Sequence, residues 1–343
     1  MRKLLTVSLL GLLLSIPSTV FAQASWYGSI RTGVESDDSN NTGVADFDSR
    51  WGIRGTSEVS EGLTAVYRYE RSIDSSDASE PDGRLSYVGL SGGFGTVTVG
   101  KVWGAAYNHF GAIVDQALNY GSPGQTGNRD SNAVSYSVSV GDVSLQADAI
   151  MDQSTGKTGD GFAFGATLGG LLETGSVAIA HRKHPDGESV STVEVDPTTT
   201  AVKKMSSSFV AGSYGIGDMT VFLGYSRDSM EDVGCTEGVT ERIRKNCYTQ
   251  SKTRTTYAGV HGGVGDTGVN YVFTMRSVKT NGTGNLFDQD AVDAVPSYLQ
   301  SKSTPWTLGL SRSLGGSATV NFEHGEPHSD DDSSSAIWLQ VDF

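Results

Sequence analysis

The stretch DFDSRWGIRGT, residues 46–56, alternates between two kinds of side chain. In a β-strand successive side chains point to opposite faces, so alternation with a period of two sorts them into two sets. One face carries the apolar residues Phe47, Trp51 and Ile53. The other face carries the charged residues Asp46, Asp48, Arg50 and Arg54. This stretch therefore predicts a strand with one apolar face and one ionic face.

The same alternation recurs along the chain, for example at residues 143–149, 269–276 and 337–343. Short glycine-rich turns separate many of these segments, as at residues 91–93, 140–142, 215–218, 262–266 and 314–316. The pattern predicts sixteen strands, near residues 25–34, 46–57, 61–72, 82–91, 94–101, 131–139, 142–150, 160–168, 175–182, 206–214, 218–227, 251–261, 264–276, 302–313, 316–325 and 334–343.

The composition agrees with an all-β protein. The chain has 44 Gly and 8 Pro among 343 residues, and only 19% of its residues are charged. Hydrophobic residues make up 37%, which is low for a large buried core. A barrel with a wet interior accounts for this shortage of apolar residues.

The connections favour a barrel over a soluble sandwich, which would also show alternation. Short turns alternate with long polar segments, so the turns gather at one rim and the loops at the other. Transmembrane barrels have this asymmetry and an even number of antiparallel strands of about ten residues. We therefore expect an all-β, transmembrane antiparallel β-barrel of sixteen strands, closed so that no strand edge remains unpaired.

The first residues predict a cleaved signal peptide at residues 1–22. Arg2 and Lys3 precede an apolar run from Leu4 to Ile16, and Ala22 suits a signal peptidase. Cleavage after Ala24 is an alternative. The rest of the chain, residues 23–343, forms the predicted barrel domain.

The formal net charge of −14 argues against nucleic acid as a partner. The two cysteines, Cys235 and Cys247, predict a loop-closing disulfide in an exported protein. Such a short ring contributes about 3 kcal/mol by chain entropy. Metal binding by the two cysteines is the weaker alternative, and we expect no cofactor.

One segment breaks the series of strands, the stretch VWGAAYNHFGAIVDQALNYGSPGQTGNR at residues 102–129. It is long enough to fold into the lumen of a barrel and narrow a pore. Asp115 provides its negative charge, because the core of the segment has no Glu. We therefore expect Asp115 to face arginines on the preceding strands.

Five motifs in this order resemble the trimeric general porins of Gram-negative outer membranes over the whole chain after residue 22. They are Trp26-Tyr27-Gly28, SRWGIRG at residues 49–55, GRLSYVGL at residues 83–90, FGTVTVGK at residues 94–101, and Phe343. The resemblance implies a sixteen-stranded barrel in a homotrimer in the outer membrane. It also implies Phe343 as a signal to the assembly machinery, and lipid and lipopolysaccharide as partners.

In this family the third external loop folds into the lumen opposite a ladder of basic residues. The resemblance places Arg50, Arg84 and Arg129 in the ladder and Asp115 in the loop. Arg31 lies two residues beyond the nearest family position. The chain lacks the Pro-Glu-Phe-Gly element of enterobacterial porins, which leaves a second loop carboxylate in question.

The alternation alone, independently of the family resemblance, also indicates which face of the wall carries the charged residues. Arg50 and Arg54 share a face with Asp46 and Asp48, and a lipid-facing Arg or Lys costs about 2–4 kcal/mol at the bilayer midplane. These arginines must therefore face the lumen. They either set ion selectivity or brace the wall by pairing with carboxylates, and both roles can coexist.

The predicted function is passive diffusion of ions and small hydrophilic solutes through a water-filled channel, with no enzymatic activity. The arginines of the constriction favour anions, while the acidic outer loops favour cations. Because salt screens the charges at the mouth over about 8–10 Å, the constriction should count for more, and we expect a preference for anions. A substrate-specific porin or a receptor or adhesin barrel remains an alternative. A divalent-ion or acid–base site at Glu323, His324, Glu326 and His328 competes with a solvated external loop there.

Overall fold

A computed structural model of the chain describes residues 23–38, 41–77, 82–122, 124–151, 161–185, 201–234, 248–285, 300–326 and 333–343. The expected signal peptide, residues 1–22, and both cysteines lie outside these ranges. So do residues 327–332, which include His328, and most of the segment between residues 281 and 300.

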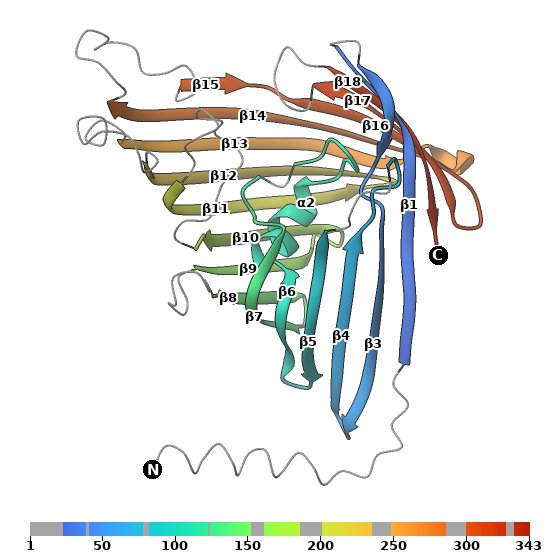
Figure 1. Cartoon of the computed structure of the whole chain (residues 1–343), viewed down its shortest axis with the longest axis vertical. Coiled ribbons are helices and arrows are strands. Elements are labelled where there is room, and N and C mark those ends of the chain that lie inside the picture. Colours follow the sequence, from blue (N-terminus) through green and yellow to red (C-terminus); the bar gives the residue numbers. More distant parts are fainter. Residues whose placement is uncertain are drawn as a thin grey trace.

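The described residues form β-strands and three short helical segments (Figure 1). The first strands are β1 (Gln23–Asp37), β2 (Thr42–Asp46), β3 (Arg50–Ser60), β4 (Leu63–Ser72), β5 (Gly83–Gly92), β6 (Gly95–Trp103), β7 (Arg129–Val140), β8 (Val143–Ile150) and β9 (Gly161–Leu171). The remaining strands are β10 (Gly175–Lys183), β11 (Ala201–Ile216), β12 (Met219–Gly234), β13 (Tyr248–Gly263), β14 (Val269–Asn285), β15 (Gln300–Ser303), β16 (Trp306–Gly315), β17 (Ala318–Glu326) and β18 (Ser334–Asp342). The helical segments are η2 (Tyr107–Gly111), α2 (Ala112–Val114) and η3 (Gly265–Thr267).

The strands form one closed antiparallel sheet in which sequential strands are neighbours and β1 pairs with β18. Two strands are interrupted. β2 and β3 both pair with β1, and β15 and β16 both pair with β14. The eighteen segments therefore make sixteen barrel strands, which confirms the predicted fold. No helix among the described residues is long and apolar enough to cross a membrane.

The alternation of the sequence becomes the two faces of the barrel wall. The register pairs Ser29 with Arg50 and Gly28 with Trp51, so the polar set shares one face and the aromatic set the other. Trp26 is 67% exposed on the outer face and stacks on Trp51 at 5.6 Å between ring centroids. Outward apolar side chains suit contact with lipid, and inward polar ones suit water.

Phe47 departs from the predicted alternation. It is buried and stacks on Trp338 at 4.7 Å between ring centroids, inside the barrel, in a cluster with Tyr120. The reason is the break between β2 and β3, where Asp48 adopts a φ of 65° and the chain leaves the regular strand geometry. The expectation that Phe47 shares the outer face with Trp51 is wrong, because alternation holds only along an uninterrupted strand.

Phe343 joins the two ends of the sheet. Its backbone N–H donates to the Gly28 carbonyl at 3.1 Å, and its carbonyl accepts from the Gly28 N–H at 2.9 Å. Its side chain is exposed, and its ring lies so close to Gly28 that a Cβ there would collide with it.

Deleting Phe343 should impair assembly of the barrel, because the deletion removes both of these hydrogen bonds from the seam between β1 and β18. The measurement is the fraction of heat-resistant folded protein in isolated outer membranes. Replacement by tyrosine keeps the ring and the backbone bonds and is the matched control. Normal assembly of the deletion variant would contradict this role.

Candidate functional site

The segment between β6 and β7 packs along the inner face of the sheet (Figure 1). Phe110 of η2 and Val114 of α2 are buried against Phe209, Phe222 and Tyr257 of β11, β12 and β13. Phe110 lies 4.8 Å from Phe209 between ring centroids. These apolar contacts hold the middle of the segment against one side of the barrel.

The first part of the segment makes polar contacts with the neighbouring strands. The Ala105 N–H donates to the Asp148 carboxylate at 2.5 Å, and the Asn108 amide donates to Gln146 at 2.7 Å. His109 forms a hydrogen bond of 2.7 Å with Thr167. Asp148 and Gln146 belong to the face of β8 that the alternation predicts to be polar.

The end of the segment is held by a carboxylate that lies about 200 residues further along the chain. Glu323 on β17 accepts hydrogen bonds from the backbone N–H groups of Leu118, Asn119 and Tyr120, at 2.6, 3.0 and 2.8 Å. Glu323 is only 2% exposed. A buried carboxylate with several N–H donors forms charge-assisted bonds that are stronger than neutral ones. This contact corrects the expectation of a solvated external loop at Glu323.

Tyr120 attaches the end of the segment to β1 and β18, the strands that follow β17 around the sheet. Its hydroxyl donates to the Glu35 carboxylate at 2.6 Å, and its ring belongs to the buried cluster with Phe47 and Trp338. The burial and the neighbouring carboxylates of Glu35 and Glu323 raise the pKa of this hydroxyl, so it remains a donor. The segment therefore contacts two separate parts of the wall.

A cavity of about 510 Å³ lies between this segment and the strands that precede it. Five of the six predicted charged residues line it, namely Arg31, Arg50, Arg84, Asp115 and Arg129. Arg54 does not line it. Its guanidinium lies over the Tyr27 ring, 5.0 Å from the centroid. The alternation placed Arg54 on the correct face but gave no information about its height in the barrel.

Four further titratable residues line the cavity, and the sequence motifs do not identify them as part of the site. They are Asp48, Arg68, Glu70 and Tyr107. The alternation of residues 67–70 does place Arg68 and Glu70 on the polar face, which is the signal that could have found them. The cavity thus presents five arginines and three carboxylates.

Ion pairs connect part of this charged wall. Glu70 accepts from Arg68 at 2.6 Å and from Arg84 at 2.7 Å, and Arg84 also pairs with Asp48. Asp48 pairs with Arg50 at 3.2 Å. These bonds show that several of the arginines brace the wall, which was the alternative role.

Two arginines of the cavity stand apart from this network. Within the described part of the chain, neither Arg31 nor Arg129 forms an ion pair. Arg31 donates to the Ser29 hydroxyl at 3.0 Å, and Arg129 lies over the Trp103 ring, 4.5 Å from the centroid. Their positive charges are therefore not neutralised by a contacting carboxylate among the described residues.

Asp115 faces the cavity from the segment. Its burial raises the pKa of the carboxyl to about 6, although the Tyr107 hydroxyl, which donates at 3.4 Å, and Arg276 act in the opposite direction. Burial and the charge of Asp115 raise the pKa of Tyr107 to about 12. Tyr107 therefore stays protonated, and Asp115 changes its charge close to neutral pH.

Both the sequence and the fold of this chain match known proteins. The sequence profile described as Gram-negative porin matches residues 7–333 of the chain. The chain belongs to the Gram-negative porin family. This membership and the barrel place the porin in the bacterial outer membrane.

Curated relatives of this porin include the major outer membrane protein P.IB of Neisseria meningitidis, 34% identical over 104 residues. That match covers 26% of this chain and 31% of the relative, so the chain matches about a third of the length of the curated relatives. Among solved structures, OmpT of Vibrio cholerae, described as a trimer form, has a TM-score of 0.70 and 15% identity over 94% of this chain and 99% of its own. An anion-selective porin from Comamonas acidovorans has a TM-score of 0.65 and 15% identity, covering 94% of this chain and all of its own.

The divalent-ion alternative finds no support in the described ranges, where no group of three or more His, Cys, Asp or Glu side chains could hold a metal ion. His324 forms a hydrogen bond with the Ser335 hydroxyl at 2.8 Å, and Glu323 holds the segment after β6.

Lowering the pH from 7.5 to 5 should raise the ratio of anion to cation permeability of this porin, with a midpoint near pH 6. The raised pKa of Asp115 means that its negative charge is present above pH 6 and lost below it. Reversal potentials in a salt gradient measure the ratio. Asp115→Asn should give the low-pH ratio at every pH in this range. An unchanged pH dependence in that variant would assign the titration to another group.

Proposed function

We propose that this porin forms a water-filled channel for passive diffusion of ions and small hydrophilic solutes across the outer membrane. The observation that carries the proposal is the cavity between the residue 102–129 segment and the arginine wall. The segment is attached to two separate parts of the wall, so it narrows the lumen while leaving this opening beside it.

The charges of the cavity favour anions in this proposal. Five arginines face three carboxylates, and Arg31 and Arg129 keep their charges free of ion pairs among the described residues. Rings of charge in a narrow pore determine which ions enter it. One structural neighbour is described as anion-selective, which is compatible with this choice.

The assembled form in this proposal is a homotrimer in contact with outer-membrane lipid and lipopolysaccharide. One neighbour is described as a trimer, and the exposed apolar side chains on the strands provide surface for lipid and for other subunits. Processing removes residues 1–22, a disulfide joins Cys235 to Cys247, and the assembly machinery acts on the strand that ends at Phe343.

A channel rather than an enzyme explains the arrangement of the site. The charged residues of the cavity pair with one another or line the opening, and the proposal includes no chemical step and no cofactor. A substrate-specific porin remains a narrower version of the same function, decided by a few side chains that face the lumen.

Single-channel recording of the purified full-length protein in planar bilayers tests the function. We expect stable conductance steps in groups of three, and a reversal potential in a potassium chloride gradient with the sign of anion preference. Protein that inserts folded but passes no current would reject the channel. A reversal potential of the opposite sign would reject the assignment of selectivity to the arginines.

A further inference from the structure

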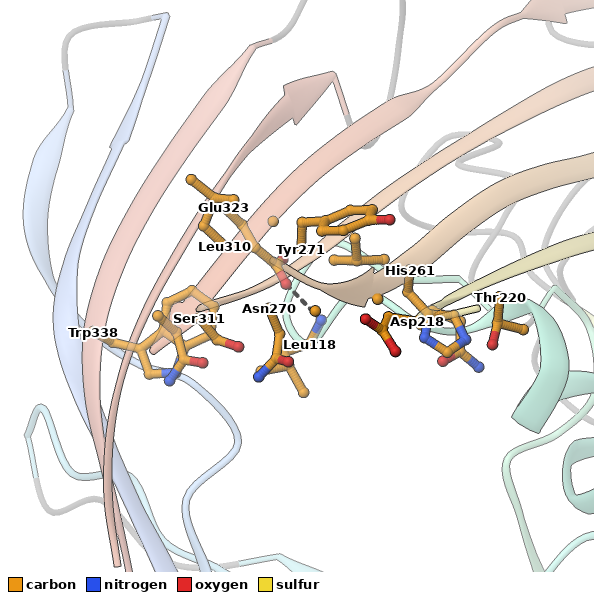
Figure 2. Close-up of a pocket in the computed structure, with 16 residues that line it drawn as sticks. Leu118, Asp218, Thr220, His261, Asn270, Tyr271, Leu310, Ser311, Glu323 and Trp338 are labelled. Carbon is orange, nitrogen blue, oxygen red and sulfur yellow. Dashed lines mark hydrogen bonds between the residues drawn. The ribbon is translucent and has the colours of Figure 1, made fainter. Parts of the chain in front are cut away.

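We call residues 118–120 the loop tip. A second cavity lies on the side of the loop tip away from the arginine-lined cavity (Figure 2). It is lined by Gln116 and Leu118 of the segment and by the inner face of β12, β13, β14, β16, β17 and β18. Its volume is about 430 Å³. Leu118 is the only residue that lines both this cavity and the arginine cavity, among the residues that the structure describes. The loop tip therefore separates the two spaces.

The lining of this second cavity mixes polar and apolar side chains, and the described residues that form it include no lysine or arginine. Its amides and hydroxyls come from Gln116, Thr220, Asn270, Ser311 and Asn321. Amides and hydroxyls offer both donors and acceptors without charge. This chemistry contrasts with the five arginines of the first cavity.

Two side chains of this lining have polar atoms without a hydrogen-bond partner among the residues that the structure describes. These atoms are Nδ2 and Oδ1 of Asn321 and Nε1 of Trp338, and both residues are 2% exposed. The two residues pair directly across β17 and β18, so two orphan donors and one orphan acceptor lie side by side. Buried polar groups of this kind are normally satisfied, and each exception calls for an explanation.

We propose that this cavity is a binding subsite for a neutral polyhydroxylated solute of about monosaccharide size. Both orphan atoms of Asn321 are shielded from solvent in the structure, so its amide must turn towards the cavity to meet a ligand. A hydroxyl both donates and accepts, so one hydroxyl can then satisfy the orphan donor and the orphan acceptor. Cavities that bind small molecules span roughly 300–1,000 Å³, a range that includes this one. The proposal rests on the proposed channel function, because the solute reaches the subsite through the lumen.

The two carboxylates at the cavity, Asp218 and Glu323, argue against anionic ligands. Glu323 is already occupied by three backbone N–H groups of the loop tip, so it has little capacity for a cation. Asp218 also lines the cavity, as Figure 2 shows, and adds a negative charge that disfavours anions. Neutral ligands that make many hydrogen bonds fit the rest of the lining best.

Gly263 gives a way to fill the cavity without disturbing the loop tip. It lines the cavity, and a Cβ there would meet only Asn270 Oδ1, at an ordinary distance of 3.7 Å. Gly263→Val therefore places a side chain in the cavity without a clash. Gly43→Val, at an exposed strand position with nothing within 4 Å of a Cβ, is the matched control.

The test uses single-channel recording of the full-length porin with glucose added to one side at a time. We expect brief, saturable interruptions of the current. Gly263→Val should weaken the apparent affinity for glucose about tenfold, because the valine side chain excludes the sugar and removes its hydrogen bonds. The channel should still conduct in the absence of sugar. Gly43→Val should behave as wild type. A conductance without any sugar-dependent interruption would overturn the subsite and leave the channel function standing, whereas absence of conductance would reject the channel itself.

A second variant separates binding from structure. Asn321→Leu removes the orphan amide with a side chain of similar size, so it should abolish the glucose interruptions and raise the melting temperature. Equal interruptions in this variant and in wild type would overturn the role of Asn321. Triethylene glycol dimethyl ether, which has almost the mass of glucose but no donors, should not interrupt the current. Equal interruption by this ether would mean that volume alone blocks the pore, and would also overturn the proposal.

Discussion

Replacing Glu323 with glutamine should increase the single-channel conductance, the open-channel noise and the size of solute that passes. The carboxylate of Glu323 accepts three backbone N–H groups from residues 118–120. A glutamine side chain keeps one oxygen but turns its NH₂ group towards an N–H donor, so at least one of these bonds is lost.

The expected size of this effect follows from the charge of the acceptor. A hydrogen bond to a charged group contributes about 1.5–3 kcal/mol to stability, so losing one bond and weakening the others removes several kcal/mol from the attachment of the loop tip. Tyr120 still anchors the tip through Glu35 at 2.6 Å and its aromatic contacts. We therefore expect a mobile tip in a barrel that remains folded.

The measurement combines conductance with the uptake of uncharged polyethylene glycols of increasing mass. Glu326→Gln is the matched control, because Glu326 lies on the same strand but its side chain points to the opposite face. Within the described part of the chain it forms no hydrogen bond with residues 118–120. Unchanged conductance and an unchanged size limit in Glu323→Gln would show that the other contacts alone hold the segment in place.

Replacing Arg50 and Arg129 together with serine should strongly reduce the preference for anions. The change leaves three arginines against three carboxylates in the cavity. A unit charge about 4 Å from an ion in water contributes roughly 1 kcal/mol, which corresponds to about a fivefold change in ion occupancy. The removal of two charges should therefore bring the permeability ratio near unity and widen the opening.

Arg84 is a poorer choice for this test. Its side chain is buried and pairs with Glu70, so its removal would leave a buried carboxylate short of a partner and destabilise the wall. Arg54→Ser is the matched control, because Arg54 shares a strand and a face with Arg50 but lies outside the cavity. If Arg54→Ser reduced the anion preference as much as the double variant, selectivity would depend on the electrostatic field of the whole lumen wall and not on the charges that line the cavity.

The sequence was sufficient to predict the barrel and its faces. Alternation is a local property, and it is repeated in each strand, as in Gln146 and Asp148 of β8, which both face inward. It failed at Phe47, where Asp48 interrupts the strand and changes the direction of the preceding side chains.

Contacts between residues that are distant in the sequence could not be predicted from the alternation. Glu323 contacts residues more than 200 positions away in the sequence, and no local pattern around it indicates such a partner. Arg54 shows a related limit, because a period of two gives the face of a residue but not its height along the barrel. Charge type and face were predictable from the sequence, whereas depth and pairing required the fold.

The contact between Glu323 and the loop tip also implies an order of folding, in which the barrel closes before the loop tip docks. The tip, at residues 118–120, is synthesised long before β17, and it cannot be clamped until the last hairpins have closed the sheet. Contacts of high sequence separation form slowly because their loop-closure entropy is unfavourable. A newly closed barrel should therefore pass through a wide, leaky intermediate before the tip docks, so a transient large conductance would mark a porin that has just finished folding.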